Sequence, residues 1–291
     1  MTAEETWTVN RLLAWTRGFF KNKGIEKPQL EAEILLAHAM NVKRIELYTA
    51  FETEPTEPQR TLFRDFVKRR GNGEPAAYLT GFKEFYSLPF HVDRSVLIPR
   101  PETEDLVLQT LEQLKTYSAS GAPVIADVGT GSGIIAVTLA KHLPKHLASA
   151  AIIAVDISAE ALNVARSNAE THGVAERIEF RQSDLLEQVS ETLDIVVSNP
   201  PYISRSEYEA LPMDIKNFEP KAALLAGIKG TEVIECLIRQ SADRLRSGGL
   251  LLIEVSPMIA ESAAALLHGW GDVRILPDSA GRQRIVCGQK C

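Results

Sequence analysis

Apolar residues recur at helical spacing in the first part of the chain. From Val9 to Phe20 they return every three or four positions, and a second run of this kind opens at Pro28. Proline is favoured at the first position of a helix because the N–H it lacks would have no partner there. A third run, Leu62–Val67, precedes the breakers Gly71-Asn72-Gly73. These patterns predict a small all-α domain over residues 1–75.

The pattern then changes to closely spaced aromatic residues. Between Tyr78 and Phe90 they are interrupted by glycine and proline, which break regular structure. Short apolar runs bounded by such breakers are typical of paired strands. We predict a β-hairpin over residues 76–98 that links two domains.

Strand and helix patterns alternate in the third part, residues 99–291. A double-proline segment and one helix come first, followed by a loop at residues 118–121. Predicted helices lie at Ile134–His142, Ala159–His172, Thr231–Arg246 and Pro257–His268. Predicted strands lie at Val124–Val128, Ile152–Val155, Ile178–Arg181, Leu193–Ser198, Leu250–Val255, Val273–Ile275 and Arg284–Cys287. The alternation predicts an α/β fold, a seven-stranded, mostly parallel sheet with helices on both faces, and ligands at the carboxyl ends of its strands.

One predicted strand ends in a stiff polar turn. The run Asp194–Ser198 leads into Asn199, Pro200, Pro201 and Tyr202. Each proline fixes its own φ, and Pro200 also restricts Asn199 to extended geometry. The Asn199 side chain and the carbonyls of the turn offer acceptors that can hold a planar –NH2 group, which suits N-alkylation. The alternative is that Asn-Pro and Pro-Pro are ordinary loop residues without a chemical role.

A glycine-rich turn follows the first strand of the α/β region. Its sequence is Asp127-Val128-Gly129-Thr130-Gly131-Ser132-Gly133, and a helix follows directly. Glycines permit a tight turn and close approach of a ligand, and the helix N-terminus leaves N–H groups free. A nucleoside-type cofactor is the natural occupant. The dinucleotide fingerprint G-x-G-x-x-G has its third glycine one residue later, so this spacing weakens the case for NAD.

Carboxylates follow the next two strands. Asp156 is placed to accept hydrogen bonds from ribose hydroxyls, and in Ser183-Asp184-Leu185 a carboxylate can meet an adenine amino group while leucine covers the ring. Each alone is more often a loop or helix-capping residue. Together with Asn199 on a fourth strand end, they indicate one site.

Composition and charge narrow the function classes. The chain has 291 residues, 45% hydrophobic and 24% charged, with a formal net charge of -6. That is the profile of a globular protein, and it argues against one whose main role is wrapping nucleic acid. Residues 1–75 are nearly balanced in charge, which favours docking or support over clamping DNA.

The three cysteines, Cys236, Cys287 and Cys291, match neither a disulfide framework nor a metal site, which favours a reducing compartment. The N-terminus lacks a signal-peptide pattern, and no stretch is apolar enough for a bilayer span. We therefore expect a cytoplasmic protein with no membrane contact and no metal.

At this point the sequence resembles the class I S-adenosylmethionine-dependent methyltransferases, and more closely the peptide chain release factor glutamine methyltransferases, the PrmC/HemK family. The resemblance covers nearly the whole chain. Asn199–Tyr202 is shared with adenine amino-methyltransferases of DNA, so it indicates chemistry rather than substrate. Narrower matches are Lys83-Glu84-Phe85-Tyr86, Ile98-Pro99-Arg100-Pro101-Glu102-Thr103-Glu104, Phe218-Glu219-Pro220 and Asp278-Ser279-Ala280-Gly281-Arg282-Gln283-Arg284.

The resemblance implies a Rossmann-like methyltransferase domain over residues 99–291 that uses S-adenosyl-L-methionine and no metal. The cofactor-binding residues it implies are Asp127, Gly129, Thr130, Gly131, Ser132, Gly133, Asp156, Asp184, Leu185 and Asn199. The three glycines would line the methionine end of the cofactor. Asn199, Pro200 and Tyr202 would be catalytic, and the substrate-binding set would comprise Asn199, Pro200, Pro201, Tyr202, Arg100 and Glu219.

The implied reaction is methylation of the glutamine side-chain amide in the Gly-Gly-Gln tripeptide of class I peptide chain release factors, which would be its protein partners. The alternatives are an adenine amino-methyltransferase of DNA or RNA, which would need a target-recognition region, and a cofactor-binding protein without turnover. One departure is Glu254-Val255-Ser256-Pro257-Met258, where the family more usually carries a glycine and then a glutamine after the glutamate.

Overall fold

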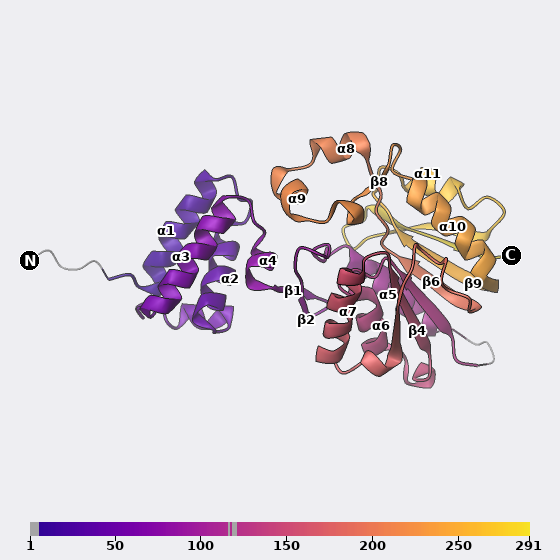
Figure 1. The fold of residues 1–291 in the computed structure, drawn as a ribbon, viewed down its shortest axis with the longest axis horizontal. Helices are drawn as coiled ribbons and strands as arrows, with labels where there is room; N and C mark the ends of the chain where they lie inside the picture. Colours follow the sequence, from indigo (N-terminus) through magenta and orange to yellow (C-terminus); the bar gives the residue numbers. More distant parts are fainter. Residues whose placement is uncertain (1–5, 116, 118–120) are drawn as a thin grey trace, which may run out of the picture. The chain divides into compact units, whose positions relative to one another are not determined.

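The chain divides into two compact units, Met1–Gly81 and Phe82–Cys291. The structure is a computed structural model that describes residues 6–115, 117 and 121–291 (Figure 1). The loop predicted at residues 118–121 lies outside the described part except for Gly121. Each unit has its own hydrophobic core, and each is described by itself below.

The first unit is helical, as the spacing of its apolar residues predicts. Thr8 caps the first helix by accepting a hydrogen bond from the Arg11 N–H, and Pro28 opens the second. The buried core brings together side chains from all three long helices, including Leu13, Leu35 and Phe66. The elements are α1 (Val9–Asn22), α2 (Pro28–Met40), the 3₁₀ turn η1 (Arg44–Tyr48), α3 (Glu57–Gly71) and α4 (Ala76–Thr80).

The predicted hairpin occupies only part of residues 76–98. Strands β1 (Phe82–Phe85) and β2 (Leu88–His91) pair antiparallel, and the two turn residues between them both have positive φ, as tight hairpin turns require. Residues 76–80 form helix α4 instead. Their sequence, Ala-Ala-Tyr-Leu-Thr, contains good helix formers, and Gly81 in the left-handed conformation ends the helix.

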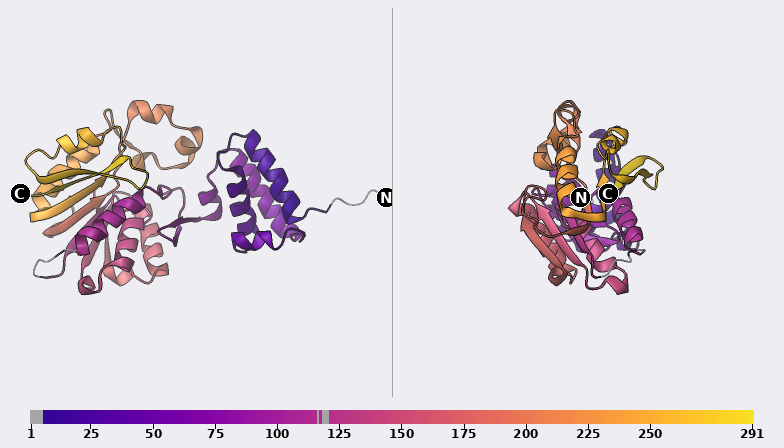
Figure 2. Two further views of the ribbon diagram at one scale, coloured as in Figure 1. Left: turned by 180° about the vertical axis from the view of Figure 1, so that it is seen from behind. Right: turned by 90° about the vertical axis from the view of Figure 1, so that its right-hand side faces the viewer.

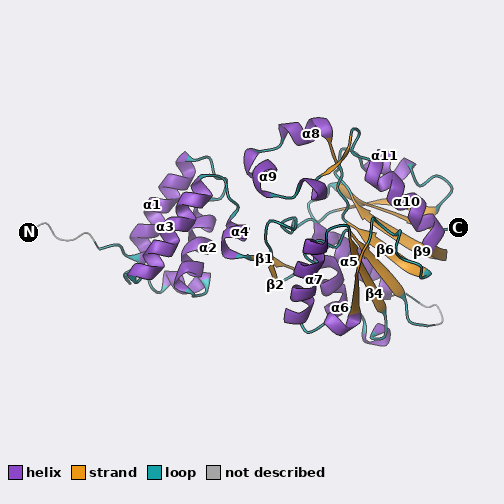
Figure 3. Cartoon of the chain, viewed as in Figure 1, coloured by secondary structure: helices purple, strands orange, loops and turns teal. Residues whose placement is uncertain are grey.

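A seven-stranded sheet forms the second unit, as predicted. The strand order is β10-β11-β9-β6-β3-β4-β5, and the strands are orange in Figure 3. Pairings from β9 through β6, β3 and β4 to β5 are parallel, whereas β11 pairs antiparallel with both β9 and β10. The strands are β3 (Val124–Val128), β4 (Ala151–Asp156), β5 (Ile178–Gln182), β6 (Leu193–Ser198), β9 (Leu245–Glu254), β10 (Gly271–Pro277) and β11 (Gln283–Gln289).

Helices cover both faces of this sheet (Figures 1 and 2). Successive strand residues alternate between two cores: Ile152 and Ala154 join the core with α5 and α6, whereas Ile153 and Val155 join the core with α10 and α11. Strands covered on both sides are apolar at nearly every position, as this sequence is. The helices are α5 (Thr103–Lys115), α6 (Ile134–His142), α7 (Ala159–Thr171), α10 (Glu232–Arg244) and α11 (Ala260–Ala265), with 3₁₀ turns η2 (Lys145–Leu147) and η3 (Ala175–Arg177).

An excursion follows β6 that the hydrophobic pattern did not predict. It contains α8 (Arg205–Ala210), α9 (Met213–Phe218) and η4 (Lys221–Ala223), and its ends are joined by the short parallel strands β7 (Ile203–Ser204) and β8 (Leu225–Gly227). Its helices have no fully buried side chains, so they leave no apolar stripe in the sequence. The capping box of Ser204 and Glu207 is a local signal for α8.

Within the part of the chain that the structure describes, no helix combines the length and apolar character that crossing a bilayer requires. Within the same part, no group of three or more His, Cys, Asp or Glu side chains is arranged to hold a metal ion.

Candidate active site

The order of strands reverses between β3 and β6, the point at which open α/β sheets bind ligands. From β3 the chain moves outward through β4 to β5, then returns to place β6 on the other side of β3. Val128 and Ser198, the last residues of β3 and β6, lie opposite each other, and the Ser198 hydroxyl donates to the Val128 carbonyl at 2.7 Å. The glycine-rich turn and the Asn199 turn therefore leave the sheet side by side.

The Asp127 side chain forms hydrogen bonds to the glycine-rich turn and to the helix that follows it. Its Oδ2 accepts hydrogen bonds from the Thr130 hydroxyl at 2.6 Å and from the Ala136 N–H at 3.0 Å. The side chain is fully buried, and its Oδ1 has no partner among the described residues. Burial raises the pKa of Asp127 to about 7, against the lowering effect of its two donors.

The glycines of this turn have the backbone that only glycine adopts easily. Gly129, Gly131 and Gly133 have φ values of 72°, 55° and 81°. At Gly133 an added Cβ would lie 3.1 Å from the Cβ of Ala165 on α7, so this glycine allows helix packing. At Gly129 and Gly131 no described atom lies within 4 Å of that position, so the space beside them is open to a ligand.

Asp156 ends β4 and closes the same turn. Its Oδ2 accepts a hydrogen bond from the Gly131 N–H at 2.9 Å, and its Oδ1 accepts one from the Ser158 N–H at 3.0 Å. Burial raises its pKa. The Ile157 backbone also donates to this carboxylate, so one of its four lone pairs remains for a hydroxyl group of a ligand.

The third strand end is tied to the second, because the Ser183 N–H donates to the Asp156 carbonyl at 2.9 Å. Asp184 follows with an exposed side chain. Leu185 has a φ of 51°, which is uncommon for a non-glycine residue and is found often at functional sites. The strand ends thus bring Asp127, Asp156 and Asp184 to one edge, as predicted from their positions.

Asn199 lies just beyond the ladder of β6, whose last paired residue is Ser198. Its Nδ2 donates to the hydroxyl of Thr103, at the start of α5, at 3.0 Å. Pro200 is buried and Tyr202 is largely buried. Burial, and the nearby carboxyl of Glu254, raise the pKa of Tyr202 to about 12.

Sequence reasoning did not assign Thr103 and Glu254 to the site. Glu254 ends β9, beside β6, and is 1% exposed. Burial raises its pKa to about 7, while a hydrogen bond from the Thr103 side chain acts in the opposite direction. Its Oε2 has no partner among the described residues. The signal in the sequence was a carboxylate directly after the apolar run Leu250–Ile253, where burial was to be expected.

Arg100 and Glu219, both predicted to bind substrate, contact each other. Arg100 Nη2 lies 2.7 Å from Glu219 Oε1, and the Ile98 N–H donates to Glu219 Oε2 at 3.4 Å. The pair joins the double-proline segment to the excursion that follows the Asn199 turn. Direct contact of either residue with a substrate stays a prediction.

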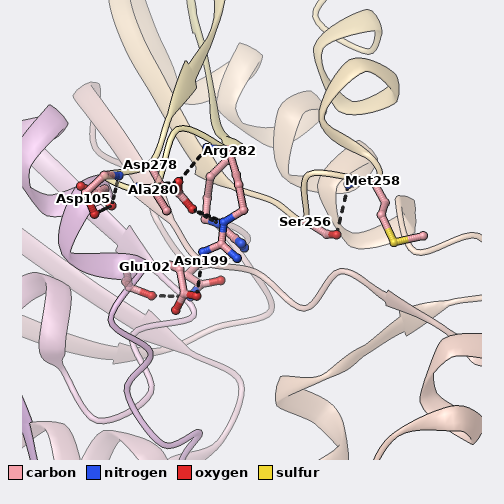
Figure 4. A network of polar contacts seen from close by, with 11 residues as sticks. Glu102, Asp105, Asn199, Ser256, Met258, Asp278, Ala280 and Arg282 are labelled. Carbon is pink, nitrogen blue, oxygen red and sulfur yellow. Dashed lines mark hydrogen bonds and ion pairs between the residues drawn. The ribbon is translucent and has the colours of Figure 1, made fainter.

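The segment Arg100–Asp105 also contacts the other motifs singled out in the sequence. The Tyr86 N–H donates to Glu104 at 2.8 Å, and the Ser279 N–H donates to Asp105 at 2.9 Å. Arg282 reaches Glu102 at 3.3 Å and Asp278 in its own turn at 3.1 Å (Figure 4). With the Asn199 turn and the excursion that contains Glu219, four segments far apart in the sequence therefore meet at Arg100–Asp105.

Ser256 and Met258 lie apart from this network in Figure 4. The Met258 side chain is 81% exposed, and its N–H donates to the Ser256 hydroxyl at 3.3 Å. The departure from the family pattern therefore falls on a surface turn rather than on the contacts of Asn199.

Comparison with known protein families gives a match for each unit. The PrmC N-terminal domain family matches residues 11–81, and the methyltransferase small domain family matches residues 103–215. Solved structures share the fold of the larger unit. The hMettl16 catalytic domain, solved with an RNA hairpin, has a TM-score of 0.53 at 17% identity and covers 81% of this chain and 82% of its own.

A second solved structure shares this fold. A Thermus thermophilus 16S rRNA methyltransferase has a TM-score of 0.52 at 18% identity, covering 72% of this chain and 50% of its own.

Whole-chain relatives are more similar. A release factor glutamine methyltransferase from Rhodopirellula baltica is 49% identical, covering 99% of both chains, and one from Chlorobaculum tepidum is 40% identical, covering 96% of both. The chain belongs to the release factor glutamine methyltransferase family.

Proposed function

We propose that this protein transfers a methyl group from S-adenosylmethionine to the side-chain amide nitrogen of glutamine in the Gly-Gly-Gln tripeptide of class I peptide chain release factors. The observation that carries the proposal is the adjacency of two turns at the strand-order reversal, one open beside Gly129 and Gly131 and the other bearing Asn199. A cofactor on the first turn then faces an amide held on the second. The relatives with this printed activity span nearly the whole chain.

The residues of the glycine-rich turn fit the cofactor. S-adenosylmethionine supplies an electrophilic methyl group on a sulfonium, and its other groups are an amino acid, a ribose and an adenine. The unpartnered Oδ1 of Asp127 suits its ammonium, and Asp156 has an acceptor position left for a ribose hydroxyl. Asp184 and Leu185 would meet the adenine.

The Asn199 turn would make the substrate nitrogen a better nucleophile. The lone pair of an amide nitrogen is delocalised into the carbonyl, so the nitrogen attacks poorly. Two acceptors, Asn199 Oδ1 and the Pro200 carbonyl, would hold the two amide hydrogens and return electron density to nitrogen. The prolines fix the direction of both acceptors before substrate arrives, so little reorganisation is needed.

Alignment and exclusion of water complete the proposed mechanism. Methyl transfer requires nitrogen, methyl carbon and sulfur to lie in line, and holding that geometry is the main task of the protein. Tyr202, whose ring packs against the core beside α10 and α11, would cover the amide plane and keep water out. After the transfer the methylated nitrogen would lose one of its two hydrogens as a proton, which passes to solvent when the product leaves the site.

The helical unit would dock the body of the release factor. This proposal rests on its match to the PrmC N-terminal domain family and on its separate core. A substrate recognised as a folded protein gives the catalytic unit a glutamine loop at high effective concentration.

Labelled methyl transfer tests the proposal. The purified protein is offered [methyl-³H]S-adenosylmethionine with a class I release factor, with the same factor carrying Gln→Ala in its tripeptide, or with unmethylated DNA. We expect label on the intact factor alone. Label on DNA would instead support an adenine methyltransferase, and cofactor binding without label on any acceptor would contradict the proposed activity.

A further inference from the structure

We propose that Thr103 and Glu254 are positioning residues that fix the orientation of the Asn199 side chain, so that its amino group is occupied and its Oδ1 stays free for the substrate amide. The inference rests on the proposed function, because it assigns Asn199 Oδ1 the role of acceptor. It adds two residues that touch neither substrate nor cofactor.

The three side chains form a directed chain of hydrogen bonds. Asn199 Nδ2 donates to Thr103 Oγ1 at 3.0 Å, and the Thr103 hydroxyl in turn interacts with the carboxyl of Glu254. Thr103 is fully buried and Glu254 is 1% exposed, so water does not compete for these groups. Because a hydroxyl has one proton, its direction toward Glu254 leaves only a lone pair for Asn199.

An ionised carboxylate makes that direction obligatory. It accepts hydrogen bonds and cannot donate, so it takes the Thr103 proton. The two ends of an Asn side chain have the same shape, and their hydrogen-bond partners decide which is which. With Thr103 as acceptor, the Nδ2 end is held against α5 and the Oδ1 end is turned to the other side. The charge on Glu254 thus selects the acceptor that the reaction needs.

Protonation of Glu254 removes this selection. A protonated carboxyl can donate to Thr103, which can then donate its own proton to Asn199 Oδ1, turning the amino group toward the substrate amide. Two amino groups would then face each other. Burial raises the pKa of Glu254 to about 7, so activity should fall as pH decreases through that value.

Several charged groups surround Glu254. Glu102 and Asp105 flank Thr103, and Arg284 approaches from β11. The hydroxyl of Tyr202, on the Asn199 turn, also lies near Glu254. Arg284 also contacts Asp278 at 3.2 Å, so it is shared between two carboxylates. The two neighbouring acids oppose ionisation of Glu254 and Arg284 favours it, which leaves its proton sensitive to conditions near neutrality.

Substitutions of buried threonines in α5 provide a matched test. Thr103→Val keeps the shape but removes the hydroxyl, and kcat should fall roughly tenfold with an unchanged KM for the cofactor, the size expected for one lost orienting hydrogen bond. Thr103→Ser should restore most of the rate. Thr110→Val is the control, since the Thr110 hydroxyl is equally buried and donates only to the Leu106 carbonyl of its own helix.

Glu254→Gln separates charge from hydrogen bonding. Glutamine still offers Thr103 an acceptor but does not titrate, so kcat at saturating cofactor should lose its dependence on pH near 7. Saturation matters because Asp127, which titrates in the same range, acts on cofactor binding. Equal kcat for Thr103→Val and Thr110→Val, or an unchanged acid limb in Glu254→Gln, would overturn the inference.

NMR of the Asn199 side-chain amide gives a readout without turnover. In ¹⁵N-labelled protein, with the signal assigned by its loss in Asn199→Ala, the amide resonances should shift with a midpoint near pH 7. That shift should be absent in Glu254→Gln. A signal insensitive to both pH and Glu254→Gln would contradict the network even if the substrate assignment failed, whereas wild-type methyl transfer tests the function itself.

Discussion

The proposed site has two halves, a cofactor half at the ends of β3 to β5 and a substrate half around Asn199, and they are held together in different ways. In the cofactor half the hydrogen bonds join residues that are close in sequence. Asp127 accepts one from Thr130, three residues away, and Asp156 accepts one from Gly131, 25 residues away. In the substrate half, Asn199 bonds Thr103 across 96 residues, Arg100 meets Glu219 across 119, and Arg282 meets Glu102 across 180. One half depends on local backbone geometry, and the other depends on side chains brought together by the whole sheet.

The difference explains where substitutions should act. Changes in the cofactor half should act mainly on cofactor affinity and local strain. Changes in the substrate half should act on the rate at saturation, because several distant segments fix one turn. The following variants test this division, in decreasing order of expected effect.

Asn199→Ala should have the largest effect. It removes one preorganised acceptor at the reacting nitrogen, which corresponds to about 3 kcal/mol of barrier, on the order of a hundredfold in kcat. Cofactor affinity, measured by calorimetry, should fall far less than kcat, because most of the implied cofactor contacts lie on the other turns. Asn163→Ala, at an exposed position of α7, is the control. Near wild-type turnover of Asn199→Ala would remove this residue from the mechanism.

Arg100→Ala and Glu219→Ala should each lower kcat/KM roughly tenfold, and the double variant should be little worse than either, because a pair that acts as a unit shows non-additive effects. Glu219 is 6% exposed, so removing its partner leaves a buried charge. The double-mutant cycle in kcat/KM is the measurement. Multiplicative losses would instead indicate that each side chain contacts the substrate independently.

Gly129→Ala should weaken cofactor binding about tenfold, or roughly 1.4 kcal/mol. Gly173→Ala is a matched control. Both glycines have similar φ values, 72° and 69°, and neither has a described atom within 4 Å of the added Cβ. Both variants should therefore lose about 1–2 kcal/mol of stability, the cost of placing a non-glycine residue in the left-handed region. Only the first places a methyl group beside the proposed cofactor, so equal dissociation constants for the two would argue against that placement.

Asp127→Asn should stabilise the free protein by about 1–3 kcal/mol at pH 8, since it removes a buried charge with an unpartnered oxygen. The folded-state pKa of Asp127 is raised to about 7 from 3.8. Folding therefore binds a proton, and the wild type regains stability as pH falls from 7 toward 4. The advantage of the variant should thus be smaller at pH 5. Urea unfolding at both pH values measures this, with exposed Asp243→Asn as reference. A constant difference between the pH values would exclude a titrating Asp127.

Met258→Gln should have the smallest effect. It restores the residue usual in the family at an exposed turn position outside the contacts of Asn199. We expect kcat and both KM values to stay within about twofold, as for most surface substitutions. A larger gain would show that this turn meets the release factor.

The difference between local and long-range contacts also decides which parts of the site could be predicted from the sequence. The strands, their order of alternation and the residues at their ends follow from local patterns, and so the positions of Gly129, Asp156 and Asn199 were predictable. Thr103 looked like an ordinary residue in the first turn of a helix, and Glu254 like part of a motif that departs from its family. Their link to Asn199 requires β6 and β9 to be neighbours, which alternation alone does not determine. The excursion at residues 203–227 was missed because its helices bury little.

The contacts of Arg100–Asp105 also set the order in which the site can be completed during synthesis. The turns after β3, β4 and β5 are synthesised by about residue 185, but the cores beneath them also contain residues of β6, β9 and β11. The partners of Glu102 and Asp105 are Arg282 and Ser279, respectively. Both lie in the turn just before β11 and are therefore synthesised late. A nascent protein therefore cannot hold the Asn199 turn in its final surroundings until the segment that contains Ser279 and Arg282 has been made.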